Sequence, residues 1–212
     1  MGAVMADQIR FLRDVRDHRM TIELDQGVHR SIKFSRPGSN TYYFRLNTWP
    51  GHLAISGDMG SYVFSRVQDM FDFFRDREMI GRINPQYWHE KADAVDRNGG
   101  AKRYSPEKFR AAIREESAEW QVRLGDAQKI LAEIEELASE GFGHEHEAYA
   151  AVRDFEASGG NSFDCFESEL TDWDFGYLWL LRAIVWGIKQ YDLHHQGRTQ
   201  ADHDKRVLAG VL

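Results

Sequence analysis

Residues 42–66 read YYFRLNTWPGHLAISGDMGSYVFSR, and this stretch decides the fold class. Three segments within it are short, with apolar residues at alternate positions, which is typical of half-buried β-strands. The connections are tight, because WPG at 49–51 suits the central positions of a type II turn and GDMG at 57–60 suits a hairpin. Residues 28–34 alternate in the same way. We therefore expect a four-stranded antiparallel meander over residues 27–66.

Helical periodicity appears on both sides of the expected sheet. Residues 7–18 predict a short N-terminal helix, and residues 67–74 predict a helix that covers one sheet face. Residues 105–138 begin with Ser-Pro-Glu, a typical helix start, and repeat apolar residues at near-heptad spacing. They predict a long helical arm or an antiparallel helical hairpin, with Gly125 as the candidate bend. Residues 175–188 are apolar on nearly all sides and predict a buried C-terminal helix, too short to span a bilayer.

Together these elements predict an α+β protein in two parts. Residues 1–100 form the expected sheet domain, and residues 101–212 form a mainly helical, acidic part. The glycine-containing segment 97–102 is the candidate linker because it has little apolar surface to bury. We expect the helix within residues 171–191 to pack back on the sheet domain.

Charge is distributed unequally along the chain, whose net charge is -7. Residues 1–105 carry 16 Lys and Arg against 13 Asp and Glu, whereas residues 106–212 carry 11 against 21. Neither half contains a basic run of the kind that binds phosphates, so direct nucleic-acid binding is not expected. An acidic surface can instead meet a basic surface of a partner. The alternative is that the glutamate-rich helix faces are simply solvated.

The 212-residue chain, with 42% hydrophobic and 29% charged residues, has the composition of a folded protein. Its single cysteine, Cys165, excludes an internal disulfide framework, and the acidic neighbours of Cys165 favour an unreactive thiol. The first residues lack the basic and apolar pattern of a secretory signal. We therefore expect a cytoplasmic protein that binds no cofactor and does not associate with a membrane.

Motifs that carry catalysis are absent from the sequence. It contains no GxSxG, GxxxxGK[ST] or GxGxxG pattern, which argues against the corresponding hydrolase and nucleotide-binding chemistries. His144 and His146 lie two residues apart at the start of an expected helix, where their side chains diverge, so no metal site is expected. We assign no catalytic residue, and the sequence favours a protein that is not an enzyme.

Four residues form a candidate pocket of polar and aromatic side chains: Trp49, Asp58, Arg66 and Arg182. Asp58 lies between glycines, where an aspartate more often stabilises a turn than acts as a base or a metal ligand. Arg182 lies on an apolar helix and needs a carboxylate or backbone carbonyl as its partner. A pairing of Arg182 with Asp58 in a cleft would favour an enzyme.

Two blocks of the sequence resemble a family of uncharacterised phage and prophage proteins. The first block is residues 42–66, and the second, FGYLWLLRAIVWGIKQY, spans residues 175–191. Their order and separation are also similar, and together they cover under a third of the chain. The resemblance implies a phage-associated origin and a protein that acts on a host system. The family supplies no activity or functional residues to transfer.

These observations favour a phage or prophage accessory protein that binds a host protein or ribonucleoprotein, for example as an anti-CRISPR-like inhibitor of an antiviral defence system. It would act by occlusion through an acidic surface. The expected interface comprises Glu115, Glu116, Glu119, Glu133, Glu136 and Glu140.

Two alternatives remain open. One is a small-molecule or nucleotide-binding enzyme or sponge with a pocket near residues 49–66. The other is a homo-oligomeric structural protein, which would form a homodimer through the long helix.

Overall fold

A computed structural model describes residues 2–75, 82–98, 100–120 and 126–195 of the chain. The described residues divide into two compact units. Unit 1 contains the residues up to Ala101 and those from Asp174 onward, and unit 2 contains Lys102–Trp173. Helices and antiparallel strands both contribute, so the predicted α+β class is confirmed.

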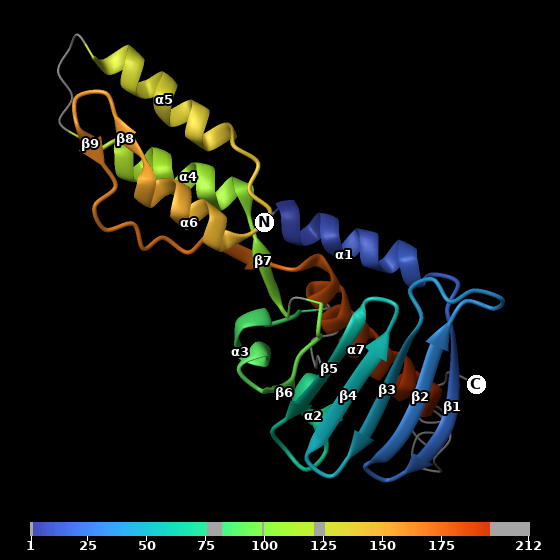
Figure 1. Ribbon diagram of the computed structural model, residues 1–212. Helices are drawn as coiled ribbons and strands as arrows, with labels where there is room; N and C mark the ends of the chain where they lie inside the picture. Colours follow the sequence, from blue (N-terminus) through green and yellow to red (C-terminus); the bar gives the residue numbers. More distant parts are fainter. Residues whose placement is uncertain (1, 76–81, 99, 121–125, 196–212) are drawn as a thin grey trace, which may run out of the picture. The chain divides into compact units, whose positions relative to one another are not determined.

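Unit 1 is built on a six-stranded antiparallel sheet whose strands lie side by side in sequence order (Figure 1). The strands are β1 (Arg19–Gln26), β2 (His29–Ser35), β3 (Phe44–Trp49), β4 (His52–Gly57), β5 (Gly60–Ser65) and β6 (Ala92–Ala94). The strands β2 to β5 correspond to the four that were predicted. Gly51 in the β3–β4 turn has a φ of 81°, as the predicted type II turn requires.

The predicted number of strands was wrong because β1 and β6 extend the sheet at its two edges. Most side chains of β1 are exposed, so its sequence lacks the clear apolar alternation of a half-buried strand. β6 is only three residues long and has no periodicity to detect.

The core of unit 1 lies between one face of the sheet and α7 (Phe175–His195), which crosses behind the strands in Figure 1. Ile32, Phe34, Phe44 and Leu46 alternate along β2 and β3 and are fully buried. The helix approaches this face closely at Gly187, where an added Cβ would lie 2.9 Å from the Leu46 Cδ1. α7 is buried along most of its first four turns, as predicted.

The described part of unit 1 also contains three shorter helices: α1 (Gly2–Val15), α2 (Met70–Phe74) and α3 (Pro85–His89). α1 packs on α7, with 5.1 Å between the ring centroids of Phe11 and Trp179. α2 is shorter than the helix predicted over residues 67–74, because Asp69 caps its start by accepting a hydrogen bond from the Phe71 amide at 3.0 Å.

The described part of unit 2 contains three helices and two small sheets. The helices are α4 (Pro106–Ser117), α5 (Ala127–Ser139) and α6 (Glu145–Asp154); β7 (Lys102–Tyr104) pairs with β10 (Thr171–Trp173), and β8 (Glu156–Ala157) with β9 (Asn161–Ser162).

The segment predicted as a long arm or a hairpin contains two helices that pack antiparallel, which corresponds to the hairpin. Arg114 at the end of α4 binds Glu135 with a 2.6 Å ion pair, and the Arg110 Nε donates to the Ala138 carbonyl at 3.2 Å. Gly125, the candidate bend, lies outside the described residues.

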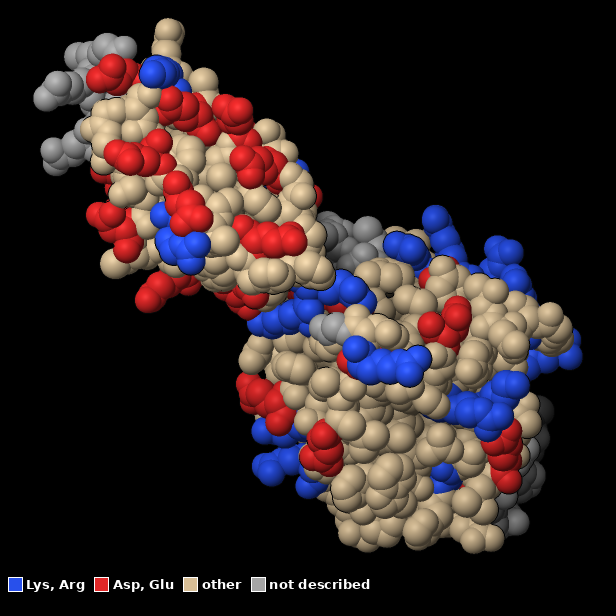
Figure 2. Space-filling model, in the orientation of Figure 1, with Lys and Arg blue, Asp and Glu red and all other residues tan. Residues whose placement is uncertain are grey.

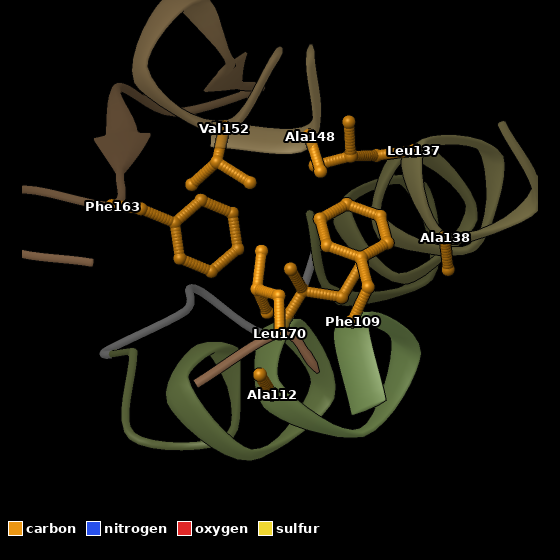
Figure 3. Packing of buried hydrophobic residues seen from close by; sticks show 9 residues of the cluster. Phe109, Ala112, Leu137, Ala138, Ala148, Val152, Phe163 and Leu170 are labelled. Carbon is orange, nitrogen blue, oxygen red and sulfur yellow. The ribbon is translucent and has the colours of Figure 1, made fainter. Parts of the chain in front are cut away.

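Unit 2 has a hydrophobic core of its own, which α4, α5 and α6 surround (Figure 3). Phe109 and Ile113, two of the heptad-spaced residues of α4, are fully buried in this core. Leu131 on α5 is 64% exposed. A homodimer through this segment stays a prediction, and Leu131 is a large apolar residue that it could bury. None of the described helices combines the length and the apolar character needed to cross a bilayer.

Candidate functional site

The net negative charge of the protein comes from unit 2. Lys102–Trp173 contains 8 Lys and Arg against 17 Asp and Glu, a net charge of -9, so the rest of the chain has a net charge of +2. Figure 2 shows acidic side chains distributed over the visible face of the helical unit, with few basic ones between them. A unit with this balance attracts basic partners over a distance comparable to the Debye length.

Four acidic residues of unit 2 surround one surface hollow of about 740 Å³, which we call the acidic hollow. Glu115 and Glu116 lie in the last turn of α4, and Glu119 follows directly after the helix. Glu119 lies four and three residues after Glu115 and Glu116, and the turn that ends α4 brings it to the same hollow. Asp164 reaches the hollow from the chain that follows β9.

Aromatic side chains form another part of the wall of the acidic hollow. Trp120 and Phe163 both line it, with ring centroids 4.7 Å apart, and both also pack in the core of unit 2, where Phe163 is 8% exposed. Carboxylates beside aromatic rings form an environment suited to the guanidinium of arginine or the ammonium of lysine, which bind both groups. Cys165 is exposed and also lines the hollow.

The β8–β9 hairpin connects the acidic hollow to α5. Gly160, Asn161 and Ser162 line the hollow, and Ser158 in the same hairpin donates its amide to the Glu133 carboxylate at 2.7 Å. Hydrogen bonds from the Ser158 hydroxyl and amide hold the pKa of Glu133 below its usual value. Glu133 therefore fixes the hairpin that walls the hollow.

The six glutamates of the predicted interface thus occupy three different settings. Glu115 and Glu119 are exposed at the acidic hollow, where Glu116 also accepts a hydrogen bond from the Ser168 hydroxyl at 2.9 Å. Glu133 binds Ser158, as described above. Glu136 and Glu140 are exposed on and directly after α5 and do not line the hollow.

Metal ligands are not clustered in the described part of the chain. No group of three His, Cys, Asp or Glu side chains among the described residues is close enough to hold a metal ion. His144 and His146 lie at the start of α6, where the Glu147 carboxylate accepts hydrogen bonds from the amides of Gly143 and His144 at 2.8 and 3.1 Å. These bonds cap the helix and lower the pKa of Glu147.

The structure does not gather the candidate pocket residues at one place, because Trp49 and Arg66 lie at one end of the sheet and Asp58 at the other. Trp49 pairs with His52 at one end of the β3–β4 ladder, whereas Gly57, directly before Asp58, pairs with Phe44 at the other end. Arg66 lies at the Trp49 end, because its amide donates to the Gly51 carbonyl at 3.3 Å.

Asp58 and Arg182 have different surroundings. The Asp58 carboxylate accepts a hydrogen bond of 2.8 Å from the Tyr42 amide, and Tyr42 has a φ of 58°, so Asp58 stabilises the backbone of this turn. Arg182 is 6% exposed and lies in the buried part of α7.

An ion pair between the buried Arg30 and the half-buried Asp69 in unit 1 was not predicted from the sequence. Arg30 on β2 is 9% exposed and donates two hydrogen bonds to the Asp69 carboxylate, at 2.8 and 2.9 Å. The guanidinium lies 4.5 Å from the ring centroid of Phe71. The signal was present, because Arg30 occupies an inward position in the alternation of β2, where a charged group needs a partner.

Comparison of the chain with protein-family models, with curated proteins and with solved structures finds no match.

Proposed function

We propose that this protein is a non-enzymatic phage or prophage accessory protein that binds a basic surface of a host macromolecule through unit 2. The acidic hollow is the centre of the contact, and the partner is a host protein or ribonucleoprotein of an antiviral defence system, such as a CRISPR effector. Binding there would occlude a surface that normally holds nucleic acid.

The observation that carries this proposal is the acidic hollow itself. Glu115, Glu116, Glu119 and Asp164 lie around a space that Trp120 and Phe163 also line. Aromatic residues and charge-assisted hydrogen bonds are the features that dominate binding energy at protein interfaces. A solvated helix face would explain the acidic residues of α4, but it would not explain why Asp164, from the chain that follows β9, lies beside them.

Paired charge reversals test whether the hollow or the overall charge of unit 2 binds the partner. The double variant Glu115→Lys/Glu119→Lys changes the hollow, and Glu136→Lys/Glu140→Lys makes the same change in charge on exposed positions outside it. Each tagged protein is used to capture partners from a bacterial lysate. We expect a partner that wild type and the α5 variant retain and that the hollow variant loses.

An infection assay supplies the functional readout. The same variants are expressed in a bacterial host with an active CRISPR system, and the efficiency of phage plating is measured. We expect wild type and Glu136→Lys/Glu140→Lys to raise plating, and Glu115→Lys/Glu119→Lys to have lost this effect. Failure to capture a partner together with unchanged plating by wild type would contradict the proposal.

The small-molecule alternative has less support. Its proposed pocket residues lie at opposite ends of the sheet or within the core, as described above. A thermal-shift screen with nucleotides tests this alternative, since a ligand that binds only the folded state raises the melting temperature.

A further inference from the structure

A second surface hollow, in unit 1, has a chemistry opposite to that of the acidic hollow. It has a volume of about 260 Å³ and is formed by Lys33 and Ser35 of β2 together with residues 36–40 of the β2–β3 loop. Two of the lining residues, Lys33 and Arg36, are cationic, and none is acidic. We call this hollow the loop site.

Two further cations stand on neighbouring strands. Arg45 on β3 lies directly opposite Lys33, and Arg19 on β1 lies directly opposite Ser35. Because alternate residues of a strand share a face and Ile32 and Phe34 point into the core, Lys33, Ser35 and their cross-strand partners lie on the outer face of the sheet. Figure 2 shows basic side chains gathered on the side of unit 1 where the β2–β3 loop lies in Figure 1.

Two carboxylates contact residues of this corner. Glu23 on β1 forms an ion pair with Arg45 and accepts a hydrogen bond from the Ser31 hydroxyl at 3.1 Å. The Asp58 carboxylate, in the β4–β5 turn, accepts a hydrogen bond of 2.8 Å from the Tyr42 amide. The four cations Arg19, Lys33, Arg36 and Arg45 outnumber these two carboxylates and leave an excess of positive charge at the loop site.

The β2–β3 loop contains a tight turn that positions the Arg36 guanidinium. The Ser39 amide donates to the Arg36 carbonyl at 3.1 Å, and Gly38 has a φ of 74°, so residues 36–39 form a tight turn. The Arg36 guanidinium donates to the Ser39 hydroxyl at 3.3 Å, which directs it across the loop. Tight loops that combine backbone amides with cations are typical anion sites, and arginine donors match the geometry of phosphate oxygens.

We propose that the loop site binds a phosphate group, carried either by a mononucleotide or by the backbone of a nucleic acid. Two separate segments supply its cations, namely β1 and the end of β2 with the following loop, because Arg45 on β3 is paired with Glu23. No basic run therefore marks the site in the sequence. The Tyr43 ring, 6.0 Å from the Lys33 Nζ, provides an aromatic face beside it. The proposal is independent of the acidic hollow, which lies in the other unit.

Nuclear magnetic resonance of the isotope-labelled full chain tests the proposal with inorganic phosphate as the probe, against sodium chloride of equal ionic strength. We expect saturable shifts of the Gly38, Ser39 and Asn40 amides. In the variant Lys33→Ala/Arg36→Ala the dissociation constant should rise at least about tenfold, because two charge-assisted contacts are lost.

A matched control removes two cations elsewhere in unit 1. Arg66→Ala/Arg97→Ala changes exposed residues that do not line the hollow, and phosphate binding should stay within about twofold of wild type, because only long-range attraction changes. Absence of saturable shifts in wild type would overturn the proposal. An equal loss of phosphate affinity in both variants would also overturn the proposal, since phosphate binding would then depend only on the overall charge of the protein.

Two further probes distinguish the sources of the phosphate. Adenosine 5′-monophosphate represents a mononucleotide, and a short single-stranded oligothymidine represents a nucleic-acid backbone. If either probe binds the protein more tightly than inorganic phosphate does, and this binding is lost in Lys33→Ala/Arg36→Ala, the result supports the loop site. The probe that binds more tightly then identifies the source of the phosphate. Equal perturbation of the same amides by adenosine without phosphate would overturn the proposal.

Discussion

At the scale of single residues, Arg30 and Asp69 connect the sheet of unit 1 to α2. The Asp69 carboxylate accepts two hydrogen bonds from the buried Arg30 guanidinium and a third from the Phe71 amide. One carboxylate therefore neutralises a buried cation and caps a helix. Removal of such a carboxylate is costly, because the guanidinium remains buried without its counter-ion.

We expect Asp69→Ala to lower the free energy of unfolding by about 2–4 kcal/mol, as measured by urea denaturation. Asp17→Ala serves as the control, because Asp17 forms an ion pair with Arg16 in which both side chains are more than half exposed. That change should cost less than about 0.5 kcal/mol. Equal effects of the two substitutions would contradict the structural role of the Arg30–Asp69 pair.

The same residue predicts a dependence of stability on pH. Burial raises the pKa of Asp69, but the hydrogen bonds from Arg30 and from the Phe71 amide outweigh burial, so the pKa lies below its usual value. A carboxyl with a lowered pKa stabilises the folded state above its unfolded pKa, about 3.9 for aspartate, and this stabilisation is lost as the pH falls through the folded-state pKa.

We therefore expect the difference in unfolding free energy between wild type and Asp69→Asn to be constant from pH 7 to about pH 5 and to shrink below about pH 4. Chemical denaturation at a series of pH values measures this difference. A difference that stays constant down to about pH 2 would show that the Asp69 charge contributes no stability.

At the scale of elements, the β3–β4 hairpin is constrained where β4 ends. An added Cβ on Gly57 would overlap the Tyr43 carbonyl oxygen and would lie 2.8 Å from the Phe44 Cα. These are backbone atoms, which cannot rotate away as a side chain can. The glycine at this position is therefore required by the close approach of two backbone segments.

We expect Gly57→Ala to destabilise the protein by at least about 2 kcal/mol, since the backbone must shift to accept the methyl group. Gly141→Ala is the comparison, because an added Cβ there would meet no atom within 4 Å. Thermal unfolding followed by circular dichroism measures both. A melting temperature unchanged by Gly57→Ala would mean that the hairpin does not have the described geometry.

The elements that the sequence predicted correctly are those whose burial leaves a local pattern. Alternation marked β2 to β5, and the continuous apolar run marked α7. β1 was missed because its side chains are mostly exposed, and an exposed edge strand has no strong apolar alternation. The division between α4 and α5 was left open because packing of two helices depends on contacts that near-heptad spacing does not specify.

The candidate site was only partly predictable for the same reason. The spacing of Glu115 and Glu119 shows that they share a helical face, whereas Asp164 lies far away in sequence and reaches them only through the fold of unit 2. The bond between Glu133 and Ser158 likewise joins residues 25 positions apart. Sequence spacing could therefore identify the acidic helices but not the hollow.

At the scale of the whole molecule, the two units have separate hydrophobic cores. The buried cluster around Phe109 consists of residues of unit 2, drawn from α4, α5, α6 and the chain that follows them. The core of unit 1 lies between the sheet and α7. A substitution that destabilises one core should therefore lower the stability mainly of the unit that contains it.

We expect Phe109→Ala to destabilise unit 2 by about 3–5 kcal/mol, because it removes a fully buried aromatic ring. Hydrogen–deuterium exchange with peptide resolution measures where protection is lost. Loss of protection should be confined to peptides within residues 102–173. Equal loss across the peptides of β2 to β5 would show that the whole chain unfolds as a single cooperative body.

The affinity of the captured host partner for wild type and for Glu115→Lys/Glu119→Lys, determined at low and at high salt, tests the central claim most directly. At low salt the hollow variant should bind at least about tenfold more weakly, because two attractive charges become repulsive. The difference in affinity between the two proteins should be smaller at high salt, where charges are screened. Equal affinity of the two proteins at low salt would contradict recognition through the acidic hollow.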